Sequence, residues 1–321
     1  MRYFITGGAG FIGSHIVDRL MAQNHDVVVY DLLINGKKEF IRQHLRKANF
    51  KFIYGDILDF ELLKKSMEGS GFIFHLAANA DIKKGLEDTK RDLMQNTVGT
   101  YNVIEAMKLN GIKKIAFTSS AAVYGEPDKY PTPEDYPLIA TSFYGASKSA
   151  GESLIESFCD AFGFQTWIFR FVSVAGERYT HGCIYDFIKK LNSNPEELEI
   201  LGDGTQRKSY VYVNDCLDAM FYVIEHAHKK VNIYNIGTDY FLAVKEIAGI
   251  VTDELGLKNV RYHYTGGIRG WQGDSPVIFL SVEKINKLGW KAKISIEEAV
   301  RSAARYLIDN NHLMYGNKNG S

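Results

Sequence analysis

Short apolar runs alternate with amphipathic segments through the first half of the chain. The apolar runs are continuous, as is typical of strands buried on both faces, and they cover 3–6, 26–30, 50–54, 72–76, 114–118 and 166–171. Between them, apolar residues recur at helical spacing over 11–22, 38–46, 60–68, 92–109 and 147–162. Strands that alternate with helices predict an α/β fold, a doubly wound parallel sheet of the Rossmann type.

The rhythm changes after residue 170. Predicted helices at 184–191, 215–226, 244–254, 282–288 and 296–308 are mixed with short strands and glycine-rich loops, which indicates a smaller α/β lobe. The segments 210–212 and 232–236 are expected to return to the main sheet. We therefore expect a dinucleotide-binding domain of residues 1–170 and about 209–238, a substrate lobe of 171–208 and 239–312, and a disordered tail at 313–321.

A glycine-rich turn follows the first strand and opens the first helix. It places Gly7, Gly10 and Gly13 where backbone amides can approach a pyrophosphate at the positive end of a helix. Asp31 ends the second strand, 18 residues after Gly13. A carboxylate there accepts hydrogen bonds from both adenosine ribose hydroxyls and repels the extra phosphate of NADP, so we expect NAD as the cofactor.

Further cofactor contacts are expected after the other strands. Asp56 and Ile57 follow the third strand, where they can flank the adenine, and Ala77 and Ala78 follow the fourth, where small side chains let the cofactor pass. Asn96, on the long helix, is expected to contact the ribose or to structure the nearby loop. The predicted cofactor-binding set is Gly7, Gly10, Phe11, Ile12, Gly13, Asp31, Asp56, Ile57, Leu76, Ala77, Ala78, Asn96, Tyr144 and Lys148.

A tyrosine and a lysine lie four residues apart on a predicted helix, at Tyr144 and Lys148. Side chains at this spacing share one face, so the ammonium is expected to lower the pKa of the phenol towards neutrality. A tyrosine tuned in this way can take a proton from a sugar hydroxyl while hydride leaves the same carbon. Ser120 follows the fifth strand, at the edge of the sheet where active sites form, and its hydroxyl can bond the reacting oxygen.

These motifs together resemble the extended short-chain dehydrogenase/reductase family. They are TGGAGFIG at 6–13, Asp31, GDI at 55–57, HLAA at 75–78, SSAAVYG at 119–125 and YGASK at 144–148, and the resemblance covers residues 1 to about 310. Within the family the chain is most similar to nucleotide-sugar epimerases of the UDP-glucose/galactose 4-epimerase type. The resemblance implies that Ser120, Tyr144 and Lys148 are catalytic, that the substrate is a UDP-sugar, and that two copies dimerise through the helices at 92–109 and 147–162.

Two alanines follow Ser120, where relatives with other chemistry carry acids. In 4,6-dehydratases of the family an Asp-Glu pair stands there, and UDP-glucuronate decarboxylases have a Glu in that neighbourhood. Ala121 and Ala122 cannot carry protons. Epimerisation needs no further acid, because oxidation at C4, turnover of the keto sugar and return of hydride to its other face complete the reaction. We therefore expect C4 epimerisation of UDP-glucose/UDP-galactose or their N-acetyl forms.

The substrate lobe contains segments that resemble the nucleotide-binding motifs of the family. GDGTQRKSY at 202–210 places Lys208 at the position of a phosphate-binding arginine, with Arg207 adjacent, and Ser173 replaces the usual asparagine in RFVSVAG at 170–176. In RGWQGD at 269–274, Arg269 is expected to reach a phosphate and Asp274 a ribose. The predicted substrate-binding set is Ser120, Ser173, Arg178, Arg207, Lys208, Arg269 and Asp274.

Composition narrows the class of protein. The chain has 38 Lys and Arg residues and 38 Asp and Glu residues, so its net charge is zero. It therefore lacks the excess of basic residues that is typical of nucleic-acid-binding proteins. The three cysteines are far apart and form no CxxC pair, which predicts neither a disulfide framework nor a metal site. No apolar run of about 18 residues is present, and the N-terminus runs directly into a strand, so we expect a cytoplasmic protein without a membrane partner.

Other hypotheses stay open at this point. A UDP-glucuronate 4-epimerase would need a cation for the C6 carboxylate, for which Arg178 or Lys84 is available. Another epimerase or dehydratase of the same family, a dehydrogenase with exchangeable NAD and a non-catalytic dinucleotide sensor are the remaining alternatives.

Overall fold

The computed structural model describes residues 1–82 and 84–314, except for the side chain of Lys84, and the chain divides into two compact units. The first unit comprises Met1–Pro127, Glu134–Phe171 and Met220–Asn235. The second comprises Asp128–Pro133, Val172–Ala219 and the chain from Ile236 onward. The predicted tail at 313–321 falls mostly on 315–321, which lie outside the described residues.

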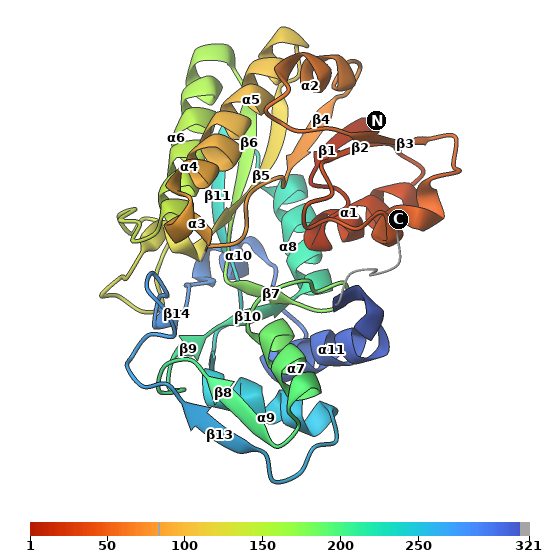
Figure 1. Ribbon diagram of the computed structural model, residues 1–321. Helices are drawn as coiled ribbons and strands as arrows, with labels where there is room; N and C mark the ends of the chain where they lie inside the picture. Colours follow the sequence, from red (N-terminus) through yellow and green to blue (C-terminus); the bar gives the residue numbers. More distant parts are fainter. Residues whose placement is uncertain (83, 315–321) are drawn as a thin grey trace. The chain divides into compact units, whose positions relative to one another are not determined.

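Seven strands form the main sheet in the order β11-β6-β5-β4-β1-β2-β3 (Figure 1). Their bounds are β1 (Arg2–Thr6), β2 (Asp26–Asp31), β3 (Phe50–Tyr54), β4 (Phe72–His75), β5 (Lys114–Ser120), β6 (Gln165–Phe171) and β11 (Val231–Ile236). Neighbours among β1 to β6 run parallel. The order of strands reverses between β1 and β4, which makes the carboxyl ends of these two strands the switch point of the sheet.

The prediction for the two late strands is half right. The segment 232–236 does return to the main sheet, as β11 beside β6. The prediction for 210–212 is wrong, because β10 (Tyr210–Tyr212) pairs in parallel with β7 (Ser173–Ala175), Tyr210 opposite Ser173. A three-residue strand carries no pattern that identifies its partner, and β7 supplies the free edge.

Helices cover both faces of the main sheet. On one face α2 (Phe60–Ser66), α5 (Gly99–Leu109) and α6 (Phe143–Phe162) share a core with the strands, in which Leu63, Ile104 and Ile155 join Phe4 and Ile115. On the other face lie α1 (Phe11–Ala22) and the part of α8 (Val213–His226) that belongs to the first unit, where Arg19 of α1 stacks on Phe221 of α8. Because helices bury both faces of the sheet, the strands are continuous apolar runs in the sequence rather than alternating ones.

The helices that carry site residues differ in detail from the prediction. The single helix expected at 92–109 is α4 (Thr89–Asp92), a wider π-helical turn (Leu93–Val98) and then α5. The helix α6 begins at Phe143 rather than at 147, because the Ser142 side chain accepts a hydrogen bond from the Gly145 N–H and caps the helix. The cap places Tyr144 in the first turn of α6.

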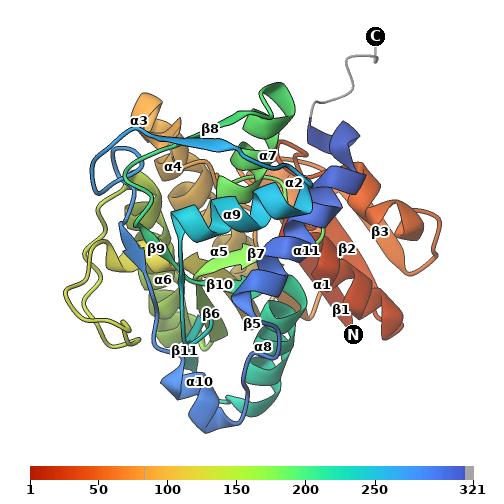
Figure 2. The ribbon, with the colours of Figure 1, turned by 90° about the horizontal axis from the view of Figure 1, so that it is seen from below.

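The second unit combines short sheets with three packed helices. The helices α7 (Cys183–Ser193), α9 (Val244–Glu254) and α11 (Ile296–Asp309) contact one another (Figure 2). Besides β7, β10 and the first part of α8, this unit contains α10 (Glu283–Leu288), β8 (Glu197–Ile200), β9 (Arg207–Lys208), β12 (Leu242–Ala243), β13 (Arg261–Tyr264) and β14 (Val277–Ile278). The first unit also contains α3 (Lys84–Glu87) and the 3-10 turns Lys38–His44 and Ala121–Tyr124, and a third such turn, Asn311–Met314, follows α11.

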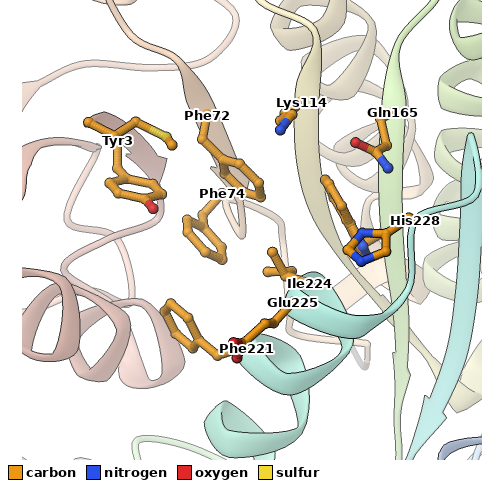
Figure 3. A pocket seen from close by; sticks show the side chains of 11 residues that line it. Tyr3, Phe72, Phe74, Lys114, Gln165, Phe221, Ile224, Glu225 and His228 are labelled. Carbon is orange, nitrogen blue, oxygen red and sulfur yellow. The ribbon is translucent and has the colours of Figure 1, made fainter. Parts of the chain in front are cut away.

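An aromatic cavity of about 260 Å³ lies at the amino ends of the strands of the main sheet, beside α8 (Figure 3). Tyr3, Phe72, Phe74, Trp167 and Phe221 line it, and charged side chains such as Lys114 and Glu225 also border it. The cavity therefore lies at the opposite end of the strands from Ser120. No helix among the described residues has both the length and the apolar character needed to cross a bilayer.

Candidate active site

The glycine turn between β1 and α1 brings two backbone segments together. Gly7 has a left-handed φ of +72°, and a Cβ atom there would lie 2.7 Å from the Ala77 amide nitrogen. A Cβ atom at Gly13 would collide with the Gly7 carbonyl. Only glycine permits these approaches, so the turn and the loop after β4 lie side by side at the switch point, where α/β proteins bind dinucleotides.

Asp31 is held at the end of β2 by the glycine turn itself. The Ala9 N–H donates to one carboxylate oxygen at 2.9 Å and the Leu33 N–H to the other at 2.7 Å. Burial raises the pKa of Asp31, and these two backbone donors offset part of that rise. Each oxygen keeps a lone pair for a ribose hydroxyl, so the turn and the acid fit the pyrophosphate and the adenosine of NAD.

The other predicted cofactor residues follow the strand ends as expected. Asp56 follows β3, where its carboxylate accepts from the Leu58 N–H at 3.0 Å. The side chain of Asn96 is 1% exposed and bonds the loop after β4, since its Oδ1 accepts from the Asn79 N–H at 2.7 Å. Phe11, Gly13 and Ile57 are buried, and Gly7, Gly10, Ile12, Asp56, Leu76, Ala77 and Ala78 are half-buried.

The three predicted catalytic side chains meet in the first unit. Ser120 is the last residue of β5, and its hydroxyl donates a hydrogen bond to the Tyr144 oxygen. Lys148, one turn further along α6, is only 3% exposed, and its ammonium donates to the Thr118 carbonyl at 2.8 Å. The same ammonium lies 5.9 Å from the centre of the Tyr144 ring. The geometry joins a hydroxyl donor, a phenol and a buried cation.

The close approach of the two catalytic elements depends on a glycine. A Cβ atom at Gly145 would collide with the Ala122 carbonyl in the turn after Ser120. That turn is the 3-10 segment Ala121–Tyr124, which begins where the Ala122 N–H donates to the Ser120 hydroxyl at 3.2 Å. Gly145 therefore lets the first turn of α6 rest against the end of β5.

The protonation equilibria differ from the expectation that Lys148 draws the phenol towards neutrality. Burial raises the pKa of Tyr144 to about 12, the hydrogen bond from Ser120 lowers it in part, and the charge of Asp92 raises it. Burial lowers the pKa of Lys148 to about 8, against the opposing charges of Glu152 and Asp92. Desolvation thus outweighs the attraction between the pair, and the lysine is the group that titrates near neutral pH.

A buried ion pair behind the catalytic residues was not foreseen as part of the site. Arg170 of β6 binds the Glu152 carboxylate through two nitrogens, the shorter contact being 2.7 Å, and Ser119 also donates to Glu152. Arg170 donates further to the Tyr124 hydroxyl at 2.8 Å. The pair ties β5, β6 and α6 together next to Ser120 and Lys148. The signal was present in the sequence, because Glu152 follows Lys148 at helical spacing.

In the second unit the structure brings two predicted substrate residues together. Lys208 and Asp274 form an ion pair of 2.7 Å, and the same ammonium donates to the Ser275 carbonyl at 2.6 Å. Asp274 also accepts from the Gly270 N–H at 3.0 Å. The sequence predicts separate roles for the two side chains, Lys208 at a phosphate and Asp274 at a ribose. Their pairing means that the Lys208 charge is already partly compensated.

The remaining substrate candidates are spread over the second unit. Arg207 is exposed, and its guanidinium lies 5.1 Å from the centre of the Phe241 ring. Ser173 is half-buried in β7, Arg178 is half-buried with a left-handed φ of 64°, and Arg269 is exposed. Within the described residues no group of three or more His, Cys, Asp or Glu side chains converges on a possible metal site.

Comparison with known proteins agrees with this geometry. The NAD dependent epimerase/dehydratase family matches residues 3–237. A putative UDP-glucose 4-epimerase of Methanocaldococcus jannaschii is 35% identical over 313 residues, covering 96% of this chain and 98% of the relative.

Solved structures of two related enzymes superpose over almost the whole chain. The UDP-glucose 4-epimerase of Thermotoga maritima, solved with UDP-glucose, is 30% identical with a TM-score of 0.87 and covers 97% of this chain and all (100%) of its own. A dTDP-glucose 4,6-dehydratase of Streptomyces venezuelae, solved with NAD, is 26% identical with a TM-score of 0.90 and covers 98% and 99%. The chain belongs to the NAD-dependent epimerase/dehydratase family.

Proposed function

We propose that this protein interconverts the C4 epimers of a nucleotide sugar, UDP-glucose and UDP-galactose or their N-acetyl forms. The observation that carries the proposal is the pair Ala121 and Ala122, which follows Ser120 in the same turn. A dehydratase needs an acid and a base beside the sugar to eliminate water. Alanine supplies neither, whereas Ser120, Tyr144 and Lys148 suffice for reversible oxidation at C4.

Each catalytic side chain has one task in this reaction. Tyr144, as the phenolate, takes the proton of the C4 hydroxyl and gives it back when the hydroxyl forms again on the other face. Ser120 donates a hydrogen bond to the reacting oxygen, as it does to the phenol, and this bond favours the phenolate. Lys148 places a positive charge beside the phenol from a buried position.

When bound, NAD supplies a positively charged hydride acceptor that gives the hydride back to the opposite face of the 4-keto sugar, so that it is not consumed. Gly7, Gly10 and Gly13 would hold its pyrophosphate, and Asp31 its adenosine ribose. The loop after β4 and Lys148 would hold its nicotinamide half.

We assign binding of the nucleotide part to side chains of the second unit. Arg207 and Arg269 are exposed, and a guanidinium can bind phosphate oxygens through two parallel hydrogen bonds, so these two arginines are the proposed diphosphate ligands. Ser173 and Arg178 complete the proposed set.

We also propose that the protein is a cytoplasmic homodimer. The outer face of α5 and α6, which lie side by side (Figure 1), exposes large apolar side chains, Tyr101 at 44% and Phe162 at 41%. Such surfaces mark protein interfaces. Light scattering should give twice the mass of the chain, and Tyr101→Glu should give the monomer. A wild-type monomer would refute this assignment.

The experiment that tests the function uses the purified protein without added NAD. It is incubated with UDP-glucose, UDP-N-acetylglucosamine, UDP-glucuronate and their GDP and CDP counterparts, and the products are resolved by anion exchange and NMR. We expect the C4 epimer of a UDP-hexose. No C4 epimer from any substrate would refute the proposal, and conversion of UDP-glucuronate alone would correct the sugar.

Tyr144→Phe should abolish turnover and leave the cofactor bound. The matched control is Tyr3→Phe, at the opposite end of the strands, which should turn over like the wild type. Turnover by Tyr144→Phe would show that another group is the base.

A further inference from the structure

Asp92 is a buried carboxylate between the loop after β4 and the catalytic helix. Asp92 is the last residue of α4 and is only 1% exposed. One of its carboxylate oxygens accepts hydrogen bonds from the side-chain amides of Asn79 at 2.8 Å and Asn96 at 3.2 Å. The other oxygen is buried and accepts no hydrogen bond from any residue that the structure describes. Gly85 leaves room for that oxygen, because a Cβ atom at Gly85 would collide with it.

The two amides connect Asp92 to both halves of the catalytic site. Asn96 donates to the Ser147 hydroxyl at 2.9 Å, and Ser147 precedes Lys148 on α6. Ser147 in turn donates to the Tyr144 carbonyl at 2.8 Å. The Asn79 N–H donates to Asn96 at 2.7 Å, which fixes the loop that follows Ala77 and Ala78. Asp92 therefore lies at the junction of the proposed cofactor loop and the catalytic turn.

These hydrogen bonds do not explain why residue 92 is an acid. Both amides donate to a single oxygen, and the carbonyl oxygen of an asparagine would accept the same two bonds. A buried carboxylate costs stability, since burial is the largest influence on Asp92 and raises its pKa. What an asparagine would lack is the negative charge, so the charge itself requires an explanation.

The charge of Asp92 faces the catalytic pair. Among the described side chains, the charged groups that act on Asp92 are Asp81, Arg91 and Lys148, and the charge of Asp92 raises the pKa of both Lys148 and Tyr144. Lys148 also faces two other titratable groups. Glu152 also raises the pKa of Lys148, more than Asp92 does, but it is tied to Arg170 in an ion pair and, among the described residues, makes no hydrogen bond to the loop after β4. His75 is uncharged, because burial and the Lys148 charge lower its pKa to about 3.

We propose that Asp92 is a positioning residue that keeps Lys148 protonated in its buried place while it holds the loop after β4 against the catalytic turn of α6. The proposal rests on the function proposed above, for which Lys148 must be cationic and Tyr144 must accept a proton. Burial lowers the pKa of Lys148 to about 8, so each neighbouring negative charge, that of Glu152 and that of Asp92, changes the fraction of the lysine that is protonated near this pH.

The direction of the effect follows from the charge. Without the negative charge of Asp92, both Lys148 and Tyr144 lose their protons at lower pH. In Asp92→Asn both limbs of the pH–rate profile should therefore move to lower pH. A purely structural role would lower the rate at every pH and leave both limbs in place.

The test combines this profile with a measurement that needs no substrate. The protein is labelled with ¹³Cε-lysine, and the Lys148 signal is assigned by its loss in Lys148→Met. We expect Lys148 to titrate near pH 8 in the wild type and at lower pH in Asp92→Asn. The matched control is Asp88→Asn, which removes the same charge one turn earlier from an exposed side chain and should not move the midpoint.

An unchanged Lys148 midpoint in Asp92→Asn would overturn the proposal. If that variant does not fold, Asp92→Ser, which removes the charge and keeps a small acceptor, decides the question by the same midpoint. If no nucleotide sugar is turned over, the proposed function fails by itself, because the lysine titration is independent of substrate.

Discussion

Replacing Lys148 by methionine should stabilise the protein while it destroys activity. The lysine is 3% exposed, and burial lowers its pKa from 10.5 to about 8, which corresponds to about 3 kcal/mol of lost stability at pH 7. Methionine has a similar shape and no charge. Loss of the hydrogen bond to the Thr118 carbonyl destabilises the variant by about 1 kcal/mol. We expect a net gain of about 2 kcal/mol, or a rise in Tm of about 3 °C.

The pH dependence identifies the cause of that gain. Below pH 8 the amine is charged in both the folded and the unfolded chain, so the wild type bears the full penalty. Between pH 8 and 10.5 the folded protein releases this proton before the unfolded chain does, and the penalty disappears. The advantage of Lys148→Met should therefore shrink as the pH rises through this window.

The assay is thermal unfolding followed by circular dichroism from pH 7 to pH 10.5, together with turnover. We expect turnover to fall about 100-fold or more. The control is Lys113→Met, since Lys113 is exposed and also donates to a backbone carbonyl, that of Phe162 at 2.9 Å. It should change stability by less than about 0.5 kcal/mol at any pH. A less stable Lys148→Met at pH 7, or a gain that does not depend on pH, would refute the reasoning.

Three further variants test other parts of the site. Asp31→Asn removes a charged acceptor and should weaken NAD binding by about 10-fold to 100-fold in titration calorimetry; a Kd within about twofold of the wild type would contradict the assignment. Gly145→Ala forces a methyl group against the Ala122 carbonyl and should lower kcat by about tenfold or more. The control is Gly249→Ala in α9, where a methyl group meets no neighbouring atom; it should keep kcat and stabilise the protein by up to about 1 kcal/mol. Lys208→Met removes the ion pair with Asp274 and should raise the KM for the UDP-sugar with little change in kcat; an unchanged KM would show that this ion pair does not support nucleotide binding.

The parts of the fold that could be predicted are those that depend only on residues close together in the sequence. The helix α1 has the predicted bounds, and β2 and β5 each extend the predicted strand by no more than two residues, because continuous apolar runs and a glycine turn specify them without reference to distant residues. The spacing of Tyr144 and Lys148 also sufficed to place both on one helix.

What could not be predicted depends on partners far away in the chain. The ion pair of Lys208 with Asp274 joins residues 66 positions apart, and Tyr210 finds its strand partner only when β7 is in place. The raised pKa of Tyr144 follows from burial, which the order of residues does not reveal. Asp92 was overlooked for the same reason, since its importance comes from what surrounds it.

The turn after Ser120 has a consequence for how new activities evolve on this scaffold. Ala121 and Ala122 are half-buried rather than sealed in the core, and it is the backbone carbonyl of Ala122 that the catalytic helix touches. Their side chains can therefore change while that contact stays. On the proposed mechanism, oxidation of the sugar uses Ser120, Tyr144 and Lys148, none of which lies at these two positions. An acid introduced at residue 121 or 122 would therefore add a proton-transfer group beside Ser120 without removing any of the three proposed catalytic side chains.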